Sequence, residues 1–234
     1  MSENELQRSL VYLYGHIDRY RLYAPELFAK FALSEDDLQV IKDLMTVQRE
    51  GLLLQTELSR EKWRDVVVES LPASFTLAKA CLLSVLDKFP RHESFGGIAA
   101  TISAFADHAK RACSAAITRE LELVHFEARH ASIALHSPAT RPTFAVIRSS
   151  YDVYGTAHSH AWPETDVPHC FFLFQAPDSQ VRILIVAPRL ADLLSLFEKG
   201  LSRGEVMQTL ESEQERAVAD ASIEKLVLAG APIA

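Results

Sequence analysis

The stretch YGTAHSHAWPETDVPHC, residues 154–170, gathers side chains that transition metals bind. Three histidines, His158, His160 and His169, stand close to Cys170 in the chain. Imidazole and thiolate together suit zinc, and alternate histidines on an extended segment would point to the same side. A stand-alone zinc or iron protein that uses residues 158–170 is therefore one possible interpretation.

The spacing of these side chains argues against that site. It matches no standard metal-ligand pattern, and the segment 161–168 contains two prolines and several other turn-forming residues. His169 and Cys170 are adjacent at the start of a predicted strand, so their side chains point to opposite faces and could not easily share one ion. We therefore predict a surface loop between strands, with no metal or other cofactor bound to this chain.

No other motif predicts an enzyme. HFEARH begins at His125 and ends at His130, whereas a metalloprotease helix needs its two histidines four positions apart. Five positions turn the two rings about 140° from each other around a helix, so we expect structural or solvent-facing roles. The sequence contains no G-x-S-x-G elbow, Walker loop or dinucleotide fingerprint. We predict that the chain has no catalytic residues.

The composition predicts a folded protein without a nucleic-acid or membrane partner. Of 234 residues, 48% are hydrophobic and 24% charged, which is usual for a globular chain. No apolar run approaches the roughly 18 residues of a membrane span. The formal charge of −7 disfavours contact with phosphates. Three scattered cysteines, and a start without the pattern of a secretory signal, predict a cytoplasmic location.

Residues 1–135 have the spacing of successive helices. Ser34 suits a helix N-cap, and Asp37 stands where a capping box has its acid. Gly51 is expected to separate this helix from the next, and Pro72 suits the first turn of a later one. One or two further helices follow Gly97. This half predicts an α-helical bundle.

After a linker at 136–142, the pattern changes over residues 143–234. The segments 143–154, 169–177 and 181–188 are short and rich in β-branched and aromatic residues, and PDSQ at 177–180 predicts a hairpin between the last two. Three short helices are expected next, the second capped by Ser202 and the third ended by Gly230. The sequence thus predicts an α+β protein: a helical bundle followed by a winged-helix-like domain of three strands and three helices.

A winged helix raises the alternative of a transcriptional regulator. Residues 190–234, however, carry eight acidic side chains against four basic ones. That excess would repel phosphates, so we expect this domain to bind something other than DNA.

Two segments carry a resemblance to a known family. REGLLLQTELSREKWRDVVVESLPASFTLAKACLL, 49–83, and ELELVHFEARHA, 120–131, resemble the helical core of accessory proteins in ribosomal-peptide maturation. Those proteins work beside multinuclear non-haem iron oxidative enzymes, as in methanobactin and thiaglutamate biosynthesis. The resemblance covers residues 30–135, and the C-terminal part resembles the winged-helix type of peptide-recognition element that such partners carry.

The resemblance implies a non-catalytic subunit. It would bind the leader of a precursor peptide and present that peptide to a partner iron-dependent oxidative enzyme, in a heterodimer, for modification of cysteine residues. The iron would belong to the partner enzyme, and residues 1–135 would dock to it.

The resemblance also implies where the peptide binds. In such proteins the strand before the first helix pairs with the peptide and the third helix closes the pocket. Here these are the strand 181–187 and the last helix, so the expected peptide-binding residues are Arg182, Leu184, Val186, Ile223, Leu226 and Val227. Arg182 could pair with an acidic leader residue. The alternative is that both faces of this apolar strand are simply buried.

Overall fold

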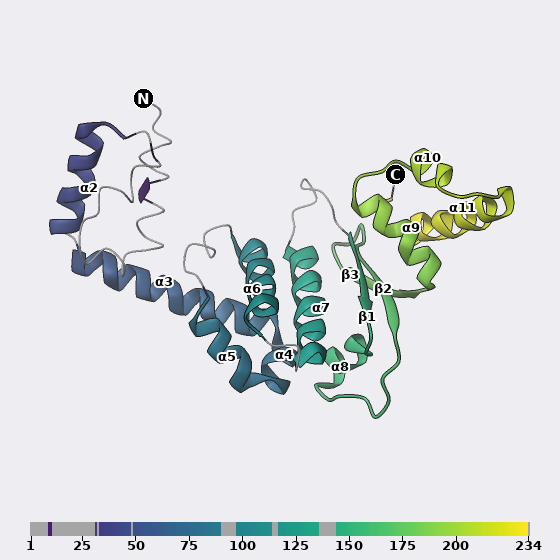
Figure 1. Cartoon of the computed structure of the whole chain (residues 1–234), viewed down its shortest axis with the longest axis horizontal. Coiled ribbons are helices and arrows are strands. Elements are labelled where there is room, and N and C mark those ends of the chain that lie inside the picture. Colours follow the sequence, from purple (N-terminus) through teal and green to yellow (C-terminus); the bar gives the residue numbers. More distant parts are fainter. Residues whose placement is uncertain are drawn as a thin grey trace.

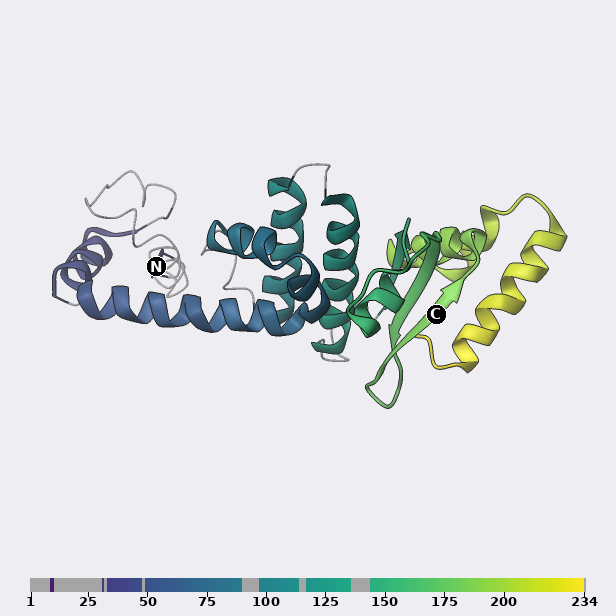
Figure 2. The ribbon, with the colours of Figure 1, turned by 90° about the horizontal axis from the view of Figure 1, so that it is seen from below.

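The computed structural model describes residues 9–10, 31, 33–47, 49–89, 97–113, 117–135 and 144–233. Within these ranges the protein is α+β, with ten helices and one three-stranded antiparallel sheet. The molecule is elongated. The helices of residues 35–47 and the first half of 49–70 project at one end, and the sheet with the C-terminal helices forms the other (Figures 1 and 2). None of the described helices is long and apolar enough to cross a membrane.

The first two described helices follow the sequence closely, with one correction. α2 (Glu35–Val47) begins with the predicted capping box: the Asp37 carboxylate accepts the N–H of Ser34 at 2.9 Å, and Ser34 Oγ accepts the N–H of Asp37 at 3.2 Å. α3 (Arg49–Ser70) starts before Gly51, so the prediction that Gly51 separates the helices is wrong. The helix-forming residues around Gly51 outweigh its cost of about 1 kcal/mol.

Four further helices pack around one apolar cluster. They are α4 (Pro72–Leu77), α5 (Lys79–Asp87), α6 (Ile98–Ala112) and α7 (Thr118–Leu135). Pro72 occupies the first turn of α4, as predicted. The cluster unites the C-terminal half of α3 with these helices through Val67, Leu71, Phe75, Leu82, Val85, Leu86, Ile102, Phe105, Ala106, Ala109, Val124 and Ala128.

The sheet has the order β1-β2-β3, formed by β1 (Phe144–Ser149), β2 (His169–Gln175) and β3 (Val181–Val186). The predicted hairpin between β2 and β3 is confirmed. Its turn is closed by a 2.8 Å hydrogen bond from the Ala176 N–H to the Gln180 carbonyl, and Ser179 adopts a left-handed backbone with φ 64°. The predicted linker, 136–142, lies outside the described residues.

One element between β1 and β2 was not predicted. Residues 153–159 form the helix α8 (Val153–Ser159), so the expectation of a strand over 143–154 and a loop from residue 154 onward is wrong there. The Asp152 side chain accepts the N–H of Gly155 at 2.9 Å and caps the helix. This N-cap favours a helix, although Tyr151, Val153 and Tyr154 are residue types typical of strands. The segment 161–168 has no regular structure, as expected of a loop.

The three C-terminal helices agree with the sequence. They are α9 (Pro188–Glu198), α10 (Arg203–Gln208) and α11 (Glu213–Leu228). Ser202 caps α10 in a capping box, and Gly230 follows α11 with φ 91°, both as predicted.

The sheet is covered on both faces. On one face, Ala145, Ile147, Phe171 and Leu173 share a cluster with Leu123 and Phe126 of α7 and Val153 of α8. On the other, Phe144, Phe172 and Phe174 pack with Leu194, Val206, Ile223 and Leu226 of the C-terminal helices. The rings of Phe126 and Phe171 meet edge to face with centroids 5.4 Å apart. A helix of the first predicted domain therefore forms one wall of the core of the second.

A buried carboxylate holds α7 to α4. Glu127 on α7 is only 6% exposed, and its two oxygens accept the N–H groups of Ala73 at 3.0 Å and Ser74 at 2.9 Å. These N–H groups belong to the first turn of α4, where no earlier carbonyl is available to them. Burial raises the pKa of Glu127, although its hydrogen bonds to Ser74 and Ala73 act in the opposite direction.

Replacing Glu127 should destabilise the fold. Glu127→Ala leaves two buried N–H groups without their acceptor, and we expect it to reduce the free energy of unfolding by about 2 kcal/mol. Urea denaturation followed by circular dichroism measures this. The matched control is Glu69→Ala, since Glu69 is exposed on α3. If both variants unfolded at the same urea concentration, the Glu127 hydrogen bonds would contribute nothing to stability.

Candidate functional site

The backbone of β3 has two sides with different partners. In an antiparallel ladder, residues whose N–H and C=O groups point to the neighbouring strand alternate with residues whose groups point away from it. The bond from Ala176 to Gln180 sets this alternation in the hairpin. When this alternation is continued along the strand, the N–H and C=O groups of Arg182, Leu184 and Val186 point to β2. The N–H and C=O groups of Val181, Ile183 and Ile185 therefore point to the free edge.

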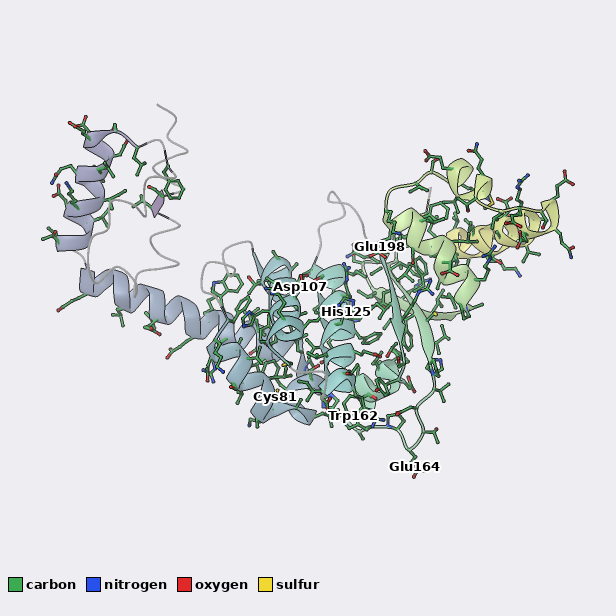
Figure 3. The ribbon with its side chains drawn as sticks, viewed as in Figure 1. Cys81, Asp107, His125, Trp162, Glu164 and Glu198 are labelled. Carbon is green, nitrogen blue, oxygen red and sulfur yellow. The ribbon has the colours of Figure 1, made fainter. Side chains whose placement is uncertain are left out.

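The same alternation continues through β2 to β1, where a side chain bonds one outward backbone group. It places the N–H of Val146 on the outer side of β1, and this N–H donates to Glu198 Oε2 of α9 at 3.3 Å. Glu198, labelled in Figure 3, is also paired with Arg129 of α7 at 3.8 Å. Next along the strand, Arg148 forms an ion pair with Asp192 of α9 at 2.5 Å. Charged side chains at an edge strand hinder the addition of another strand.

The edge of β3 has no such cover. Among the described residues, no hydrogen bond reaches the outward backbone groups of Val181, Ile183 or Ile185. The side chain of Ile185 is 61% exposed, although Val181 and Ile183 are half-buried against the cluster around Phe171. The alternative that both faces of the strand are buried therefore does not hold at Ile185. Within the part of the chain that the structure describes, β3 is therefore an apolar edge strand whose outward donors and acceptors have no partner.

The predicted residues on β3 are divided between the core and the surface. Leu184 and Val186 are half-buried against the cluster beneath the C-terminal helices. Arg182 is exposed, and its guanidinium donates to the carbonyl of Ala229 at 2.9 Å and to Asp178 at 3.4 Å. Arg182 thus fastens the end of α11 to the start of β3, a role that the sequence did not indicate.

The predicted residues on α11 do not all face outward. Ile223 and Leu226 are buried in the core, with exposed fractions of 0% and 7%, whereas Val227 is 41% exposed. Leu228, which the sequence interpretation left out, is 82% exposed. The bond from Arg182 to the Ala229 carbonyl shows that the chain just after α11 lies beside the start of β3. Sequence spacing alone could not show which side of α11 meets the sheet.

A cleft of about 300 Å³ continues the edge at the far end of β3. Ile185, Val186 and Pro188 line one side of it, and the ends of β1 and β2 supply the rest: Arg148, Ser149, Ser150, Pro168, His169 and Cys170. The cleft therefore mixes an apolar strand end with a cation, an imidazole and hydroxyl groups. It can receive the side chain or the terminus of a segment that lies along β3.

The three histidines considered as metal ligands occupy different settings. His158 is in the last turn of α8, with its ring 4.5 Å from that of Tyr154, and His160 ends the helix with φ 52°. His169 begins β2, and its ring lies 5.6 Å from that of Phe171. Within the described residues, no group of three or more histidine, cysteine, aspartate or glutamate side chains is arranged to hold an ion.

The loop 161–168, which lies between His160 and His169, is attached to α7 through an arginine. The Arg119 guanidinium lies 4.4 Å from the ring centre of Trp162 and 5.3 Å from that of Tyr151. It also donates to Asp166 at 2.7 Å. Trp162, labelled in Figure 3, thus stacks under a cation, which is a structural contact that holds the loop 161–168 in place.

The histidines of HFEARH both lie on α7. Burial is the main cause that lowers the pKa of His125 and of His130, and the charges of Arg129 and Lys110 lower that of His125 further. Lowered pKa values keep both rings neutral near pH 7. In the described part of the chain, neither ring belongs to a group of three side chains that could hold a metal ion.

Comparison with known proteins gives no family: no protein-family model matches the sequence, and no curated protein matches it.

The assignment of the two sides of β3 predicts an alternating pattern of hydrogen exchange. The amides of Arg182, Leu184 and Val186 should exchange slowly because they bond to β2. Those of Ile183 and Ile185 should exchange at least about a hundredfold faster because they face solvent. Exchange followed residue by residue with NMR measures both sets. Equal protection along the whole strand would show that another segment covers the edge.

Proposed function

We propose that the chain is a non-catalytic subunit that binds an extended peptide on the open edge of β3 and presents it to a partner enzyme. The carrying observation is the contrast between the two edges of one small sheet. Glu198 and the Arg148–Asp192 pair guard the edge of β1, whereas no described residue bonds the outward backbone groups of Ile183 and Ile185. An apolar edge strand is a template for an added strand, and most proteins protect such edges.

Addition of a strand supplies affinity and selectivity by separate means. Main-chain hydrogen bonds to the outward groups of β3 supply affinity, and pockets for alternate side chains supply selectivity. The cleft beside Ile185 offers room for one such side chain. β3 is also the strand that leads into the first C-terminal helix, which is where the family resemblance locates the peptide.

The rest of the proposal rests on the resemblance. The C-terminal part acts as a peptide-recognition element of winged-helix type, and the helices before it dock to an iron-dependent oxidative enzyme that modifies the bound precursor peptide. The exposed apolar side chains of the helical half support such docking, since Val40 and Val47 of α2 and Leu54 and Leu58 of α3 are all more than 40% exposed. Leu54 and Leu58 are one helical turn apart and share one face.

Peptide binding should depend on the backbone of Ile185 more than on its side chain. Ile185→Pro removes an outward N–H without breaking a bond to β2, because proline is tolerated at an exposed edge. We expect the Kd for a labelled precursor leader to rise at least about tenfold, from the loss of a main-chain bond and the steric effect of the ring. Fluorescence anisotropy measures the Kd.

The matched control is Ile185→Ala, which keeps the N–H and should retain most of the affinity. In the wild type, the amides of Ile183 and Ile185 should also become protected from exchange when peptide is added. If Ile185→Pro bound the peptide as tightly as the wild type and these amides stayed unprotected, the peptide would not pair with β3.

The partner enzyme should form a stable complex with this chain through α3. Co-expression with an iron enzyme encoded beside it should yield a heterodimer on size exclusion at micromolar concentration. Leu54→Glu combined with Leu58→Glu should separate the two proteins, because it charges an apolar docking face. The same variant should bind the leader peptide with unchanged Kd. Separate elution of the unmodified pair would contradict the docking role.

A further inference from the structure

Two of the three cysteines lie side by side although 32 positions separate them. Cys81 is in the first turn of α5 and is labelled in Figure 3, and Cys113 follows the last residue of α6. Their sulfur atoms are 3.9 Å apart, and both residues are half-buried. Cys113 has an extended backbone with φ −92° and ψ 144°, so its side chain is not restricted to the rotamers of a helix.

We propose that Cys81 and Cys113 are a thiol pair that forms a reversible intramolecular disulfide when a hydroperoxide reaches the helical half of the protein. A disulfide has its sulfurs about 2.05 Å apart, so the two Sγ atoms must approach by roughly 2 Å. Rotation of the Cys113 side chain, just beyond the last residue of α6, can supply part of this movement. The proposal does not depend on the peptide-binding function.

The reaction takes two steps. The Cys81 sulfur attacks the outer oxygen of the hydroperoxide, the O–O bond breaks, and an alcohol or water leaves, which gives a sulfenic acid at Cys81. The Cys113 sulfur then gives up its proton and attacks the Cys81 sulfur, the S–O bond breaks, and water leaves. Two thiols lose two electrons in total, and the peroxide gains them. A low-molecular-weight dithiol reverses the bond by exchange.

The environment of Cys113 suggests this order of events. Burial, together with the neighbouring Cys81 thiol, raises the pKa of Cys113 to about 11. Cys113 therefore stays protonated near pH 7, and a protonated thiol is the poorer nucleophile for the first step. Cys81 lies in the first turn of α5, where the helix dipole stabilises negative charge, so the first step is assigned to Cys81 and Cys113 completes the bond.

The disulfide would connect the start of α5 to the end of α6. Both helices contribute to the cluster that contains Leu82 and Phe105, so the bond would restrain elements already packed together. The third cysteine, Cys170, belongs to β2 and lines the cleft at the end of β3. It has no cysteine neighbour and serves as an internal reference.

Oxidation of the full-length chain tests the pair. The reduced protein is treated with hydrogen peroxide near pH 7, and thiols are then counted after denaturation. We expect the count to fall from three to one, with a crosslinked peptide containing Cys81 and Cys113 in mass spectrometry and a monomer on a non-reducing gel. Dithiothreitol should restore all three thiols. The oxidised form should melt at or above the Tm of the reduced form, since a bond that fits the fold lowers the entropy of the unfolded chain.

Three variants sharpen the test. Cys170→Ser should still lose two thiols, whereas Cys81→Ser should form no intramolecular bond. Cys113→Ser should instead accumulate a sulfenic acid at Cys81, which dimedone traps. Three intact thiols in the treated wild type, crosslinks between chains through Cys170, or a Tm several degrees lower after oxidation would each overturn the proposal.

Discussion

The carboxylate of Glu127 and the ring of Phe126 are neighbours on α7 and reach two different elements, because consecutive side chains point about 100° apart around a helix. Glu127 accepts two N–H groups from the first turn of α4, which joins α7 to the helical half. Phe126 meets Phe171 of β2 edge to face, which joins the same helix to the sheet. A carboxylate is costly to bury unless its oxygens are satisfied, so the position of α4 is constrained by Glu127. The helix that covers one face of the sheet is therefore also bonded to the helical half of the protein.

A sheet of three strands has two edges, and a helix contacts the backbone of one edge but not of the other within the described residues. α9 follows directly from β3, crosses the sheet and reaches β1, where Glu198 accepts the N–H of Val146. The helix that starts at one edge thus protects the other. No described element returns to cover the edge of β3: α11 packs on one face of the sheet through Ile223 and Leu226, and its end is bonded to Arg182 through the Ala229 carbonyl. The open edge is a consequence of the chain order, and the apolar residues of β3 make it suitable for an added strand.

The sequence predicted features that depend on a few neighbouring residues better than features that depend on packing. Ser34, Ser202 and Gly230 mark helix ends through their own hydrogen bonds and backbone freedom, and all three are confirmed. α8 was missed because Asp152 competes with a run of residues that favour strands, and only the cap decides between them. On α11, the apolar residues are too evenly distributed for spacing to show that Ile223 faces the core and Leu228 the solvent. The hydrogen bond from Val146 to Glu198 joins residues 52 positions apart, and no local sequence pattern predicts such a contact.

The distance between the two proposed surfaces has a consequence for how a peptide could be presented. The apolar face of α3 and the edge of β3 lie toward opposite ends of the molecule, with α6 and α7 between them (Figure 2). A partner docked on α3 and a peptide paired with β3 would therefore not compete for the same surface. The route between them passes through α7, which Glu127 joins to α4 and Phe126 joins to β2. In the proposed complex, such a connection would hold the peptide in a fixed position relative to the partner, and correct positioning alone can lower the barrier of a reaction.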